Sequence, residues 1–393
     1  MKYLFSFLLC WLMQSLWAQD QVLKGRVLDE KTNEPVAFAS VFINTTTTGT
    51  LTNEKGEFVL TVKAGNYEII VSIVGYEPLV LALDTRKKLA ASYLFKIQPK
   101  TYSLQTVGVK GKRDDSWYDN LKIFKEQFLG RSEIAQQCRL LNEDQLVIVF
   151  DPETALLEVK SDEVLKIENR ELGYRINYLL TEFRYEMRQG YVAYLGYPSF
   201  ELMEGNKSQQ KRWAKNRQRA FKGSVMHFVR SLRNQKLEEE GFNLRRLIRM
   251  PNPNRPTEEE LNEARQKIRE RGSFRKDDPL DKILAKASLP KIIEKLDTAR
   301  VSYDEFLKKD QLVFEGVFQV VYTGEKEEPA YVLSQSHHRN RQPTFQTSVF
   351  YLKTDSVLLE ENGSLLPPLG VMFEGYWGWE KVGDLLPVDY TDR

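Results

Sequence analysis

Cysteine is nearly absent from this 393-residue chain, which contains only Cys10 and Cys138. Cys10 lies in an N-terminal apolar segment with the pattern of a cleavable leader, so the mature protein would keep Cys138 alone. One cysteine cannot form an internal disulfide, so the fold must be held by packing. Ile134 and Leu141 flank Cys138 at helical spacing, which favours a buried, unreactive thiol over a disulfide to another chain.

Histidine is also scarce, and the usual catalytic patterns are missing. The three histidines are His227, His337 and His338, and the adjacent pair fits a solvated loop better than a metal site. The sequence has no Gly-x-Ser-x-Gly nucleophile elbow and no phosphate-binding loop. Ser224 and His227 are three residues apart on a predicted helix, with no positioned acid beside them. We therefore predict no catalytic residue, no bound metal and no cofactor.

Long apolar runs and an excess of one charge are missing too. The leader, residues 1–18, has Lys2, an apolar run from Leu4 to Leu12 and a cleavage site near Ala18. That run is too short for a stable transmembrane helix, so we expect an exported protein without a membrane span. A net charge of +2 gives no overall attraction to nucleic acid.

Short β-type runs alternate with turn clusters between Leu23 and Pro78. This spacing predicts a small antiparallel β-sandwich of the seven-stranded type over residues 21–98. One strand face is expected to be buried, and its members follow a period close to two. They are Val27, Val36, Phe38, Val41 and Ile43.

The motifs of this stretch follow one another in a fixed order. They are Gly25-x-Val27, Asp29, Glu34-Pro35-Val36, Ala39-x-Val41, Thr48-Gly49-Thr50-x-Thr52, Gly56-x-Phe58 and Val74-Gly75-Tyr76. On these residues the segment resembles the carboxypeptidase regulatory-like domain, a transthyretin-like β-sandwich of exported Bacteroidota proteins. The resemblance implies a fold and a cell-envelope setting, either periplasmic or peripherally attached to the outer membrane.

The name of that domain does not imply peptidase activity here. A zinc carboxypeptidase holds its metal with a His-x-x-Glu pair and a distant histidine. His227 is followed by Phe-Val-Arg and His338 by Arg-Asn-Arg, so neither supplies the glutamate.

The rest of the chain alternates between strand-like and helix-like periods. After a linker at residues 99–115, we predict an α+β domain over residues 116–393, with strands on either side of a helical insert at about residues 208–272. The predicted fold class is therefore mainly β plus α+β.

A basic cluster without acidic residues lies between Gly205 and Leu237. Its candidate surface for an anionic partner is Lys211, Arg212, Lys215, Arg217 and Arg219. After export, such a surface suits an acidic envelope protein, an anionic glycan or lipid phosphates better than nucleic acid. The alternative is a solvated helix face that pairs with acids elsewhere in the fold.

An aromatic cluster with interleaved glycines lies near the C-terminus. Tyr376, Trp377 and Trp379 could form a stacking platform for sugar rings, or they could be core side chains at tight turns.

The first hypothesis is a non-enzymatic envelope protein that binds or assembles with another component through its sandwich and C-terminal domain. The alternatives are an unrecognised hydrolase or glycan-acting enzyme, and a carbohydrate-binding protein.

Overall fold

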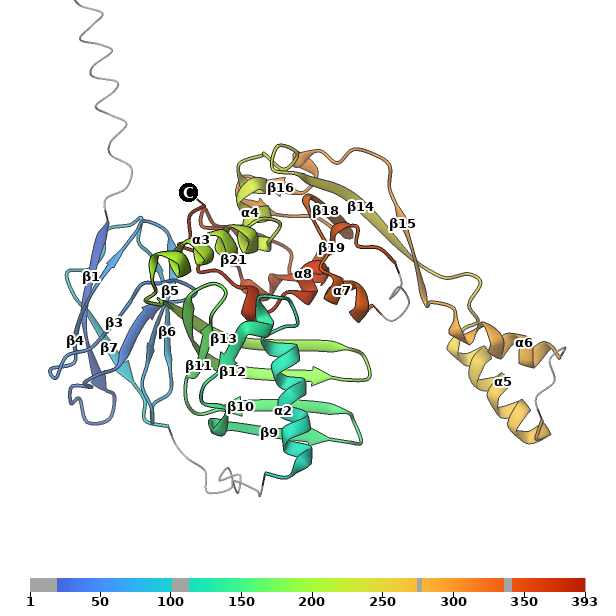
Figure 1. Cartoon of the computed structure of the whole chain (residues 1–393), viewed down its shortest axis with the longest axis horizontal. Helices are drawn as coiled ribbons and strands as arrows, with labels where there is room; N and C mark the ends of the chain where they lie inside the picture. The colour runs from blue at the N-terminus through green and yellow to red at the C-terminus, as the bar shows by residue number, and fades with distance from the viewer. Residues whose placement is uncertain (1–19, 101–112, 274–277, 336–340, 393) are drawn as a thin grey trace, which may run out of the picture.

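The computed structural model describes residues 20–100, 113–273, 278–335 and 341–392. Figure 1 shows an N-terminal β-sandwich, a first sheet covered by a long helix, and a second sheet from which an arm projects. His337 and His338, for which a solvated loop was predicted, lie outside the described residues, as do the leader and most of the predicted linker.

The N-terminal region forms a seven-stranded sandwich, as predicted. Its strands are β1 (Gln21–Asp29), β2 (Ser40–Ile43), β3 (Gly49–Leu51), β4 (Glu57–Val62), β5 (Asn66–Ser72), β6 (Leu79–Asp84) and β7 (Tyr93–Ile97). One sheet has the strand order β4-β1-β7 and the other has the order β3-β2-β5-β6. The pairings are antiparallel except that of β1 with β7, which is parallel.

Phe38 departs from the predicted strand face. Val27, Val36 and Val41 are buried between the sheets, but the side chain of Phe38 is 65% exposed. Its backbone φ of 61° is left-handed, and its N–H donates to the carbonyl oxygen of Thr52 at 3.0 Å. The backbone turns here before β2 begins, so the prediction that Phe38 belongs to the buried face is wrong.

A six-stranded antiparallel sheet follows the sandwich. Its elements are α2 (Asp115–Phe128), η3 (Ala135–Gln137), β8 (Cys138–Leu140), η4 (Glu143–Gln145), β9 (Leu146–Asp151), β10 (Leu156–Ser161), β11 (Leu165–Asn169), β12 (Tyr174–Glu186) and β13 (Tyr191–Leu202). β12 pairs with β11 and β10 along one side and with β13 along the other. Phe124 and Phe128 of α2 pack edge to face on Phe183 of β12, which places the core under this helix.

The stretch at residues 208–272, predicted to be a helical insert, contains a strand between its helices. Its elements are α3 (Lys207–Phe221), α4 (Val225–Arg233), β14 (Phe242–Pro251) and α5 (Glu258–Arg271). β14 continues outward from the body and returns as β15 (Ile292–Leu296), after α6 (Pro279–Ala285) and η5 (Lys286–Ser288). In Figure 1 this ribbon forms the arm, with α5 and α6 at its tip.

The second sheet has the order β15-β14-β18-β19-β22, with a small four-stranded sheet, β16-β17-β20-β21, beside it. The remaining elements are η6 (Tyr303–Glu305), β16 (Leu307–Lys308), β17 (Gln311–Leu312), β18 (Val317–Lys326), α7 (Pro329–Ser334), β19 (Phe345–Leu352), β20 (Val357–Leu359), β21 (Leu365–Leu366), η7 (Pro368–Gly370), β22 (Val371–Gly375), α8 (Tyr376–Trp379) and η8 (Val382–Asp384).

Two hydrophobic cores occupy the region predicted to form one α+β domain, residues 116–393. The first lies between α2 and the six-stranded sheet, and the second is built by α4 and the β14-β18-β19 sheet. Val382 and Leu386 come after the second core in sequence, yet they pack into the first. The C-terminal segment therefore ties the two cores together.

The segment between β2 and β3 attaches the sandwich to the rest of the chain. Thr46 forms a parallel bridge with β13. The Thr45 N–H donates to the Pro198 carbonyl oxygen at 2.7 Å, and the Phe200 N–H donates to the Thr46 carbonyl oxygen at 2.9 Å. The Val388 N–H of the C-terminal segment donates to the Thr45 carbonyl oxygen at 2.8 Å. Main-chain hydrogen bonds thus continue from the sandwich into both β13 and the C-terminal segment.

Side chains add to this contact. The Asp389 carboxylate accepts a hydrogen bond from the Thr47 N–H at 3.1 Å and another from the Thr47 hydroxyl. Farther along the sandwich, Asn66 Nδ2 donates to Glu360 Oε1 at 2.6 Å. The sandwich is therefore held against the body at more than one point.

Candidate functional site

The inner face of α3 binds four consecutive carbonyl oxygens of the turn at residues 170–173. Trp213 and Asn216 donate to the first two, each at 2.9 Å, and Arg217 donates to the last two at 2.7 and 3.1 Å. The guanidinium of Arg217 also lies 4.1 Å from the centre of the Tyr174 ring. Partial burial lowers the pKa of Arg217. The structure therefore corrects one predicted member of the basic surface, because Arg217 fastens α3 to the sheet.

Two more of the predicted basic residues are paired with acids. Arg219 lies 3.0 Å from a carboxylate oxygen of Glu133 and 3.3 Å from one of Glu328. Arg212 lies 3.9 Å from a carboxylate oxygen of Glu171 and is more exposed. The alternative interpretation, a helix face that pairs with acids elsewhere, therefore fits Arg219, which has two close carboxylates. It fits Arg212 less well, because the single carboxylate beside Arg212 is farther away.

The outer face of α3 carries three exposed lysines at four-residue spacing, Lys207, Lys211 and Lys215. We call these residues the lysine face. Among the described residues, none of them forms an ion pair. Lys207 lies in the first helical turn, which has no acidic residue, so its charge opposes the helix dipole. The predicted surface residues Lys211 and Lys215 are therefore open to a partner.

The predicted aromatic platform is not an exposed surface. The side chains of Tyr376 and Trp377 are 2% and 6% exposed. The indole Nε1 of Trp377 donates to the Gly223 carbonyl oxygen at 2.7 Å, which fixes α8 against the bend between α3 and α4. Of the two interpretations of this cluster, core side chains at tight turns describes Tyr376 and Trp377, and neither ring is available for stacking.

Trp379 differs from its neighbour. It is half-buried, and its ring centre lies 5.5 Å from that of Tyr331 and 5.3 Å from that of Tyr376. Its Nε1 is buried and has no hydrogen-bond partner among the described residues. Trp379 is thus the member of the predicted platform that reaches a cavity.

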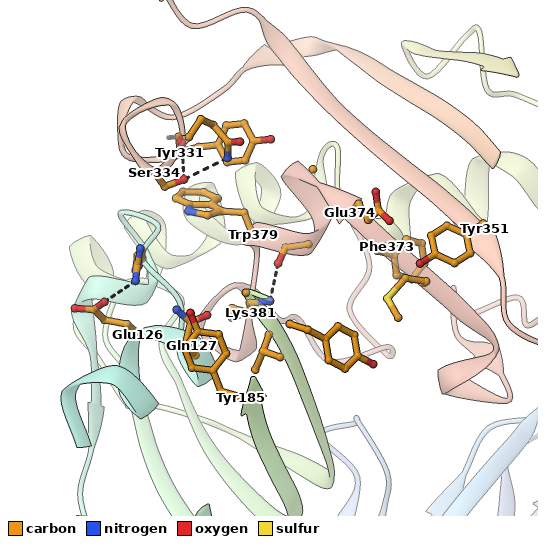
Figure 2. Close-up of a pocket in the computed structure, with 18 residues that line it drawn as sticks. Glu126, Gln127, Tyr185, Tyr331, Ser334, Tyr351, Phe373, Glu374, Trp379 and Lys381 are labelled. Atoms are coloured by element: carbon orange, nitrogen blue, oxygen red, sulfur yellow. Dashed lines mark hydrogen bonds and ion pairs between the residues drawn. The ribbon is translucent and has the colours of Figure 1, made fainter. Parts of the chain in front are cut away.

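That cavity is a cleft of about 510 Å³ between the first and second sheets. Figure 2 shows Tyr331 and Trp379 on one side of it, Phe373 and Tyr351 on the other, and Tyr185 of β12 below. Among these lining residues, Trp379 belongs to the predicted platform, and Phe373 lies in the same aromatic stretch of the sequence. Tyr185, Tyr331 and Tyr351 come from β12, α7 and β19, so no local spacing in the sequence brings them to this cleft.

A group of carboxylates lies behind Trp379 around a second cavity of about 30 Å³. Burial raises the pKa of Glu325, Glu328 and Glu380 above the ordinary range, and it raises that of Asp384 to about 6. The Asp384 carboxylate accepts hydrogen bonds from the Ser132 hydroxyl and, at 3.1 Å, from the backbone N–H of Lys381, the N-cap residue of η8.

Raised carboxylate pKa values can indicate acid–base catalysis, but the space beside these carboxylates is small. A cavity of about 30 Å³ has room for about one water molecule and none for a substrate. The Ser132–Asp384 hydrogen bond also includes no histidine to act as a base. These carboxylates join α3, α7 and the C-terminal segment rather than line the larger cleft.

His227 has a structural role at the start of α4. Its Nδ1 accepts a hydrogen bond from the Gly223 N–H at 3.1 Å, which leaves the proton on Nε2, 3.2 Å from a Glu240 oxygen. Burial lowers the pKa of this imidazole. Ser224 is the N-cap of the same helix and accepts from the His227 N–H, so its hydroxyl is not aligned for attack.

Within the described ranges, no group of three or more histidine, cysteine or acidic side chains is arranged to hold a metal ion. The helices in those ranges are also too short or too polar to cross a bilayer.

Comparison with solved structures gives weak likenesses. A 9R-lipoxygenase from Cyanothece is 10% identical over 55% of this chain and 48% of its own, with a TM-score of 0.16. A protein of unknown function from Bacteroides fragilis is 10% identical over 92% of this chain and 96% of its own, with a TM-score of 0.18. Neither likeness supports an argument about fold or function.

Comparison of sequences gives a clearer result for the N-terminal region. Residues 23–109 match the family model of the CarboxypepD_reg-like domain. The TonB-dependent receptor SusC of Bacteroides thetaiotaomicron is 47% identical over 62 residues, which is 16% of this chain and 6% of the receptor. The chain thus spans a small fraction of that relative. The N-terminal sandwich belongs to the CarboxypepD_reg-like domain family.

Proposed function

We propose that this protein is a non-catalytic binding and assembly protein of the Bacteroidota cell envelope, and that it docks an acidic partner protein on the lysine face of α3. The lysine face is the observation that carries the proposal. Lys207, Lys211 and Lys215 are exposed, and their charges are not neutralised by ion pairs among the described residues.

The position of these charges is not explained by helix stability. Acidic side chains stabilise the first turn of a helix, and α3 begins instead with Lys207 behind a capping box of Asn206 and Gln209. Trp213 and Arg217 on the opposite face already attach the helix to the sheet. The lysine face is therefore free to contact another molecule.

A protein partner fits this surface better than a lipid bilayer. Helices that lie on membranes insert large apolar side chains beside their basic residues. In α3 the large apolar side chains, Trp213 and Phe221, are buried in the protein. A row of acidic side chains on another protein would match the lysine spacing without requiring insertion.

The envelope setting rests on the leader pattern at residues 1–18 and on the CarboxypepD_reg-like domain. The matched relative is named as a TonB-dependent receptor, which also supports an exported protein, periplasmic or peripherally attached to the outer membrane.

A photo-crosslinking experiment tests the proposal. Benzoylphenylalanine at Gln218, an exposed position on α3, would capture a neighbour in envelopes of the source bacterium. We expect a protease-sensitive adduct with the wild-type face and its loss when Lys207, Lys211 and Lys215 are all changed to Glu.

The matched control changes Lys282, Lys286 and Lys295, three exposed lysines of the arm, to Glu. It alters net charge equally and should keep the adduct. Equal adduct yields in the two triple variants, a protease-resistant adduct, or no adduct from the wild-type protein would each contradict an acidic protein partner.

A further inference from the structure

We infer that the cleft between the two sheets binds an uncharged sugar ring of a glycan, which is a function beyond the proposed docking by α3. Its volume of about 510 Å³ falls within the range of small-molecule sites, roughly 300–1,000 Å³. The walls come from β12 and β13 on one side and from α7, β19, β22 and α8 on the other.

Six of the eighteen residues that line this cleft are aromatic. They are Tyr185, Tyr191, Tyr331, Tyr351, Phe373 and Trp379. A sugar ring has apolar C–H faces and a rim of hydroxyls, so it can pack on aromatic faces while its rim bonds to polar groups. Figure 2 shows Tyr331 and Trp379 on one side of the cleft and Phe373 and Tyr351 on the other, so aromatic rings line both sides.

The charges of the cleft favour an uncharged ligand. Glu126 and Arg131 form an ion pair at 2.7 Å, and the Lys381 ammonium donates to the Gly378 carbonyl oxygen at 2.6 Å. Glu374 is held by Arg249, with one oxygen 3.2 Å from the guanidinium. The charged residues that line the cleft are thus two acids and two bases, and each of them already has a polar partner within the protein. An ionic ligand would have to break these contacts, whereas hydroxyls can add to them.

Trp379 contributes to the cleft an indole ring that is not held by a hydrogen bond within the described residues. The Trp377 indole is anchored by its hydrogen bond to Gly223, but the Trp379 indole has no hydrogen-bond partner among the described residues. The Trp379 ring packs beside the rings of Tyr331 and Tyr376. Trp379 lines the cleft and its indole makes no hydrogen bond within the described residues, so its ring is suited to stack on a ligand.

Ligand binding can be measured on the intact mature protein with maltohexaose, cellohexaose and xylohexaose as neutral probes and hexagalacturonate as the charged probe. We expect saturation-transfer difference NMR and tryptophan fluorescence to detect at least one neutral probe, with a Kd near 1 mM or below. Hexagalacturonate should bind at least tenfold more weakly.

The variants Tyr191→Ala and Trp379→Phe should each weaken binding of that neutral probe by about tenfold, because each removes ring area from the cleft. Tyr191 is 43% exposed, so its truncation should leave the fold intact. The control Tyr118→Ala removes an aromatic ring of α2 that is 55% exposed and away from the cleft, and it should leave binding unchanged.

Three results would overturn the inference. The first is that no neutral probe binds at a probe concentration 10-fold above the expected Kd. The second is that hexagalacturonate binds as tightly as the neutral probe. The third is that both cleft variants bind the neutral probe with unchanged affinity. The triple lysine variant of α3 should keep sugar binding, so failure of the docking proposal and failure of this inference give different results.

Discussion

Gly173 and Trp213 meet where β12 begins and α3 packs against the sheet. Gly173 has a backbone φ of 66°, and a Cβ at this position would overlap the indole of Trp213. Gly173→Ala would therefore combine a left-handed alanine with an overpacked contact. We expect it to lower the free energy of unfolding by about 3 kcal/mol in urea denaturation.

Gly272 provides the matched control for that substitution. It has a similar φ of 73°, but no atom lies within 4 Å of the position that a Cβ would take. Gly272→Ala should cost about 1 kcal/mol, from the backbone conformation alone. Equal losses in the two variants would show that the contact with Trp213 does not matter.

Asp384 should make stability fall as pH rises. Its pKa is raised to about 6 by burial, above the ordinary value near 3.9 in an unfolded chain. As pH rises from about 4 to 6, the unfolded state loses its proton first, which favours unfolding. Glu325, Glu328 and Glu380 act in the same direction, and His227 acts in the opposite one because its pKa is lowered.

The variant Asp384→Asn tests this effect. Removing the Asp384 charge also lowers the pKa of Glu380 and Lys381, which that charge raises, so the comparison reports on Asp384 together with these two neighbours. The amide oxygen can still accept from Ser132. Thermal unfolding from pH 4 to pH 7 should show the variant gaining stability relative to the wild-type protein as pH rises. A difference that does not change with pH would contradict the assignment.

The two faces of α3 show what the sequence could and could not predict for an element. The sequence alone shows the cluster of basic residues and predicts a helix from about residue 208. In the structure this helix, α3, begins at Lys207 and is capped by Asn206. The sequence does not show which basic residues attach α3 to the sheet and which face the solvent. The groups that Arg217 binds are carbonyl oxygens of a turn far away in the sequence. Side chains of one charge along a helix do not reveal which of them face the protein.

A pair of substitutions tests this division. Arg217→Gln removes two charge-assisted hydrogen bonds and the contact with Tyr174, so it should lower the free energy of unfolding by about 2 kcal/mol. Lys215→Gln, two residues earlier on the exposed face, should change it by less than about 0.5 kcal/mol. Comparable losses in urea denaturation would show that the two faces are not distinct.

Cys138 is half-buried, and it lies in a different element from the helix that the sequence pattern predicted. Helical spacing of its neighbours predicted a buried thiol, yet Cys138 begins strand β8 after one turn of 3-10 helix, and Leu141 is 55% exposed. Burial nevertheless raises the pKa of the thiol to about 12, consistent with low reactivity. The segment Cys138–Leu140 is short, and its antiparallel pairing with β11 determines its conformation instead of the helical spacing of its neighbours.

At the scale of the whole molecule, the sequence predicted the N-terminal sandwich well and the arrangement of the rest poorly. The sandwich has short strands, turn residues at regular spacing and a family motif, all local signals. The cleft, the carboxylate group behind Trp379 and the return of Val382 and Leu386 to the first core depend on residues far apart in the chain. Such contacts leave no periodic pattern in a single sequence.

The sandwich and the body are docked against each other as one unit. This docking depends on the threonine segment between β2 and β3, whose main chain bonds to β13 and to the C-terminal segment. If that contact exists in solution, three amides far apart in sequence share protection from solvent: those of Thr45, Phe200 and Val388.

Hydrogen–deuterium exchange of the mature protein, resolved to single amides, measures this directly. The account predicts that all three amides exchange at least about 100-fold more slowly than an unstructured chain. Exchange of the Thr45 and Val388 amides at unstructured rates, with β12 still protected, would mean that the sandwich is tethered without being docked and would contradict the account.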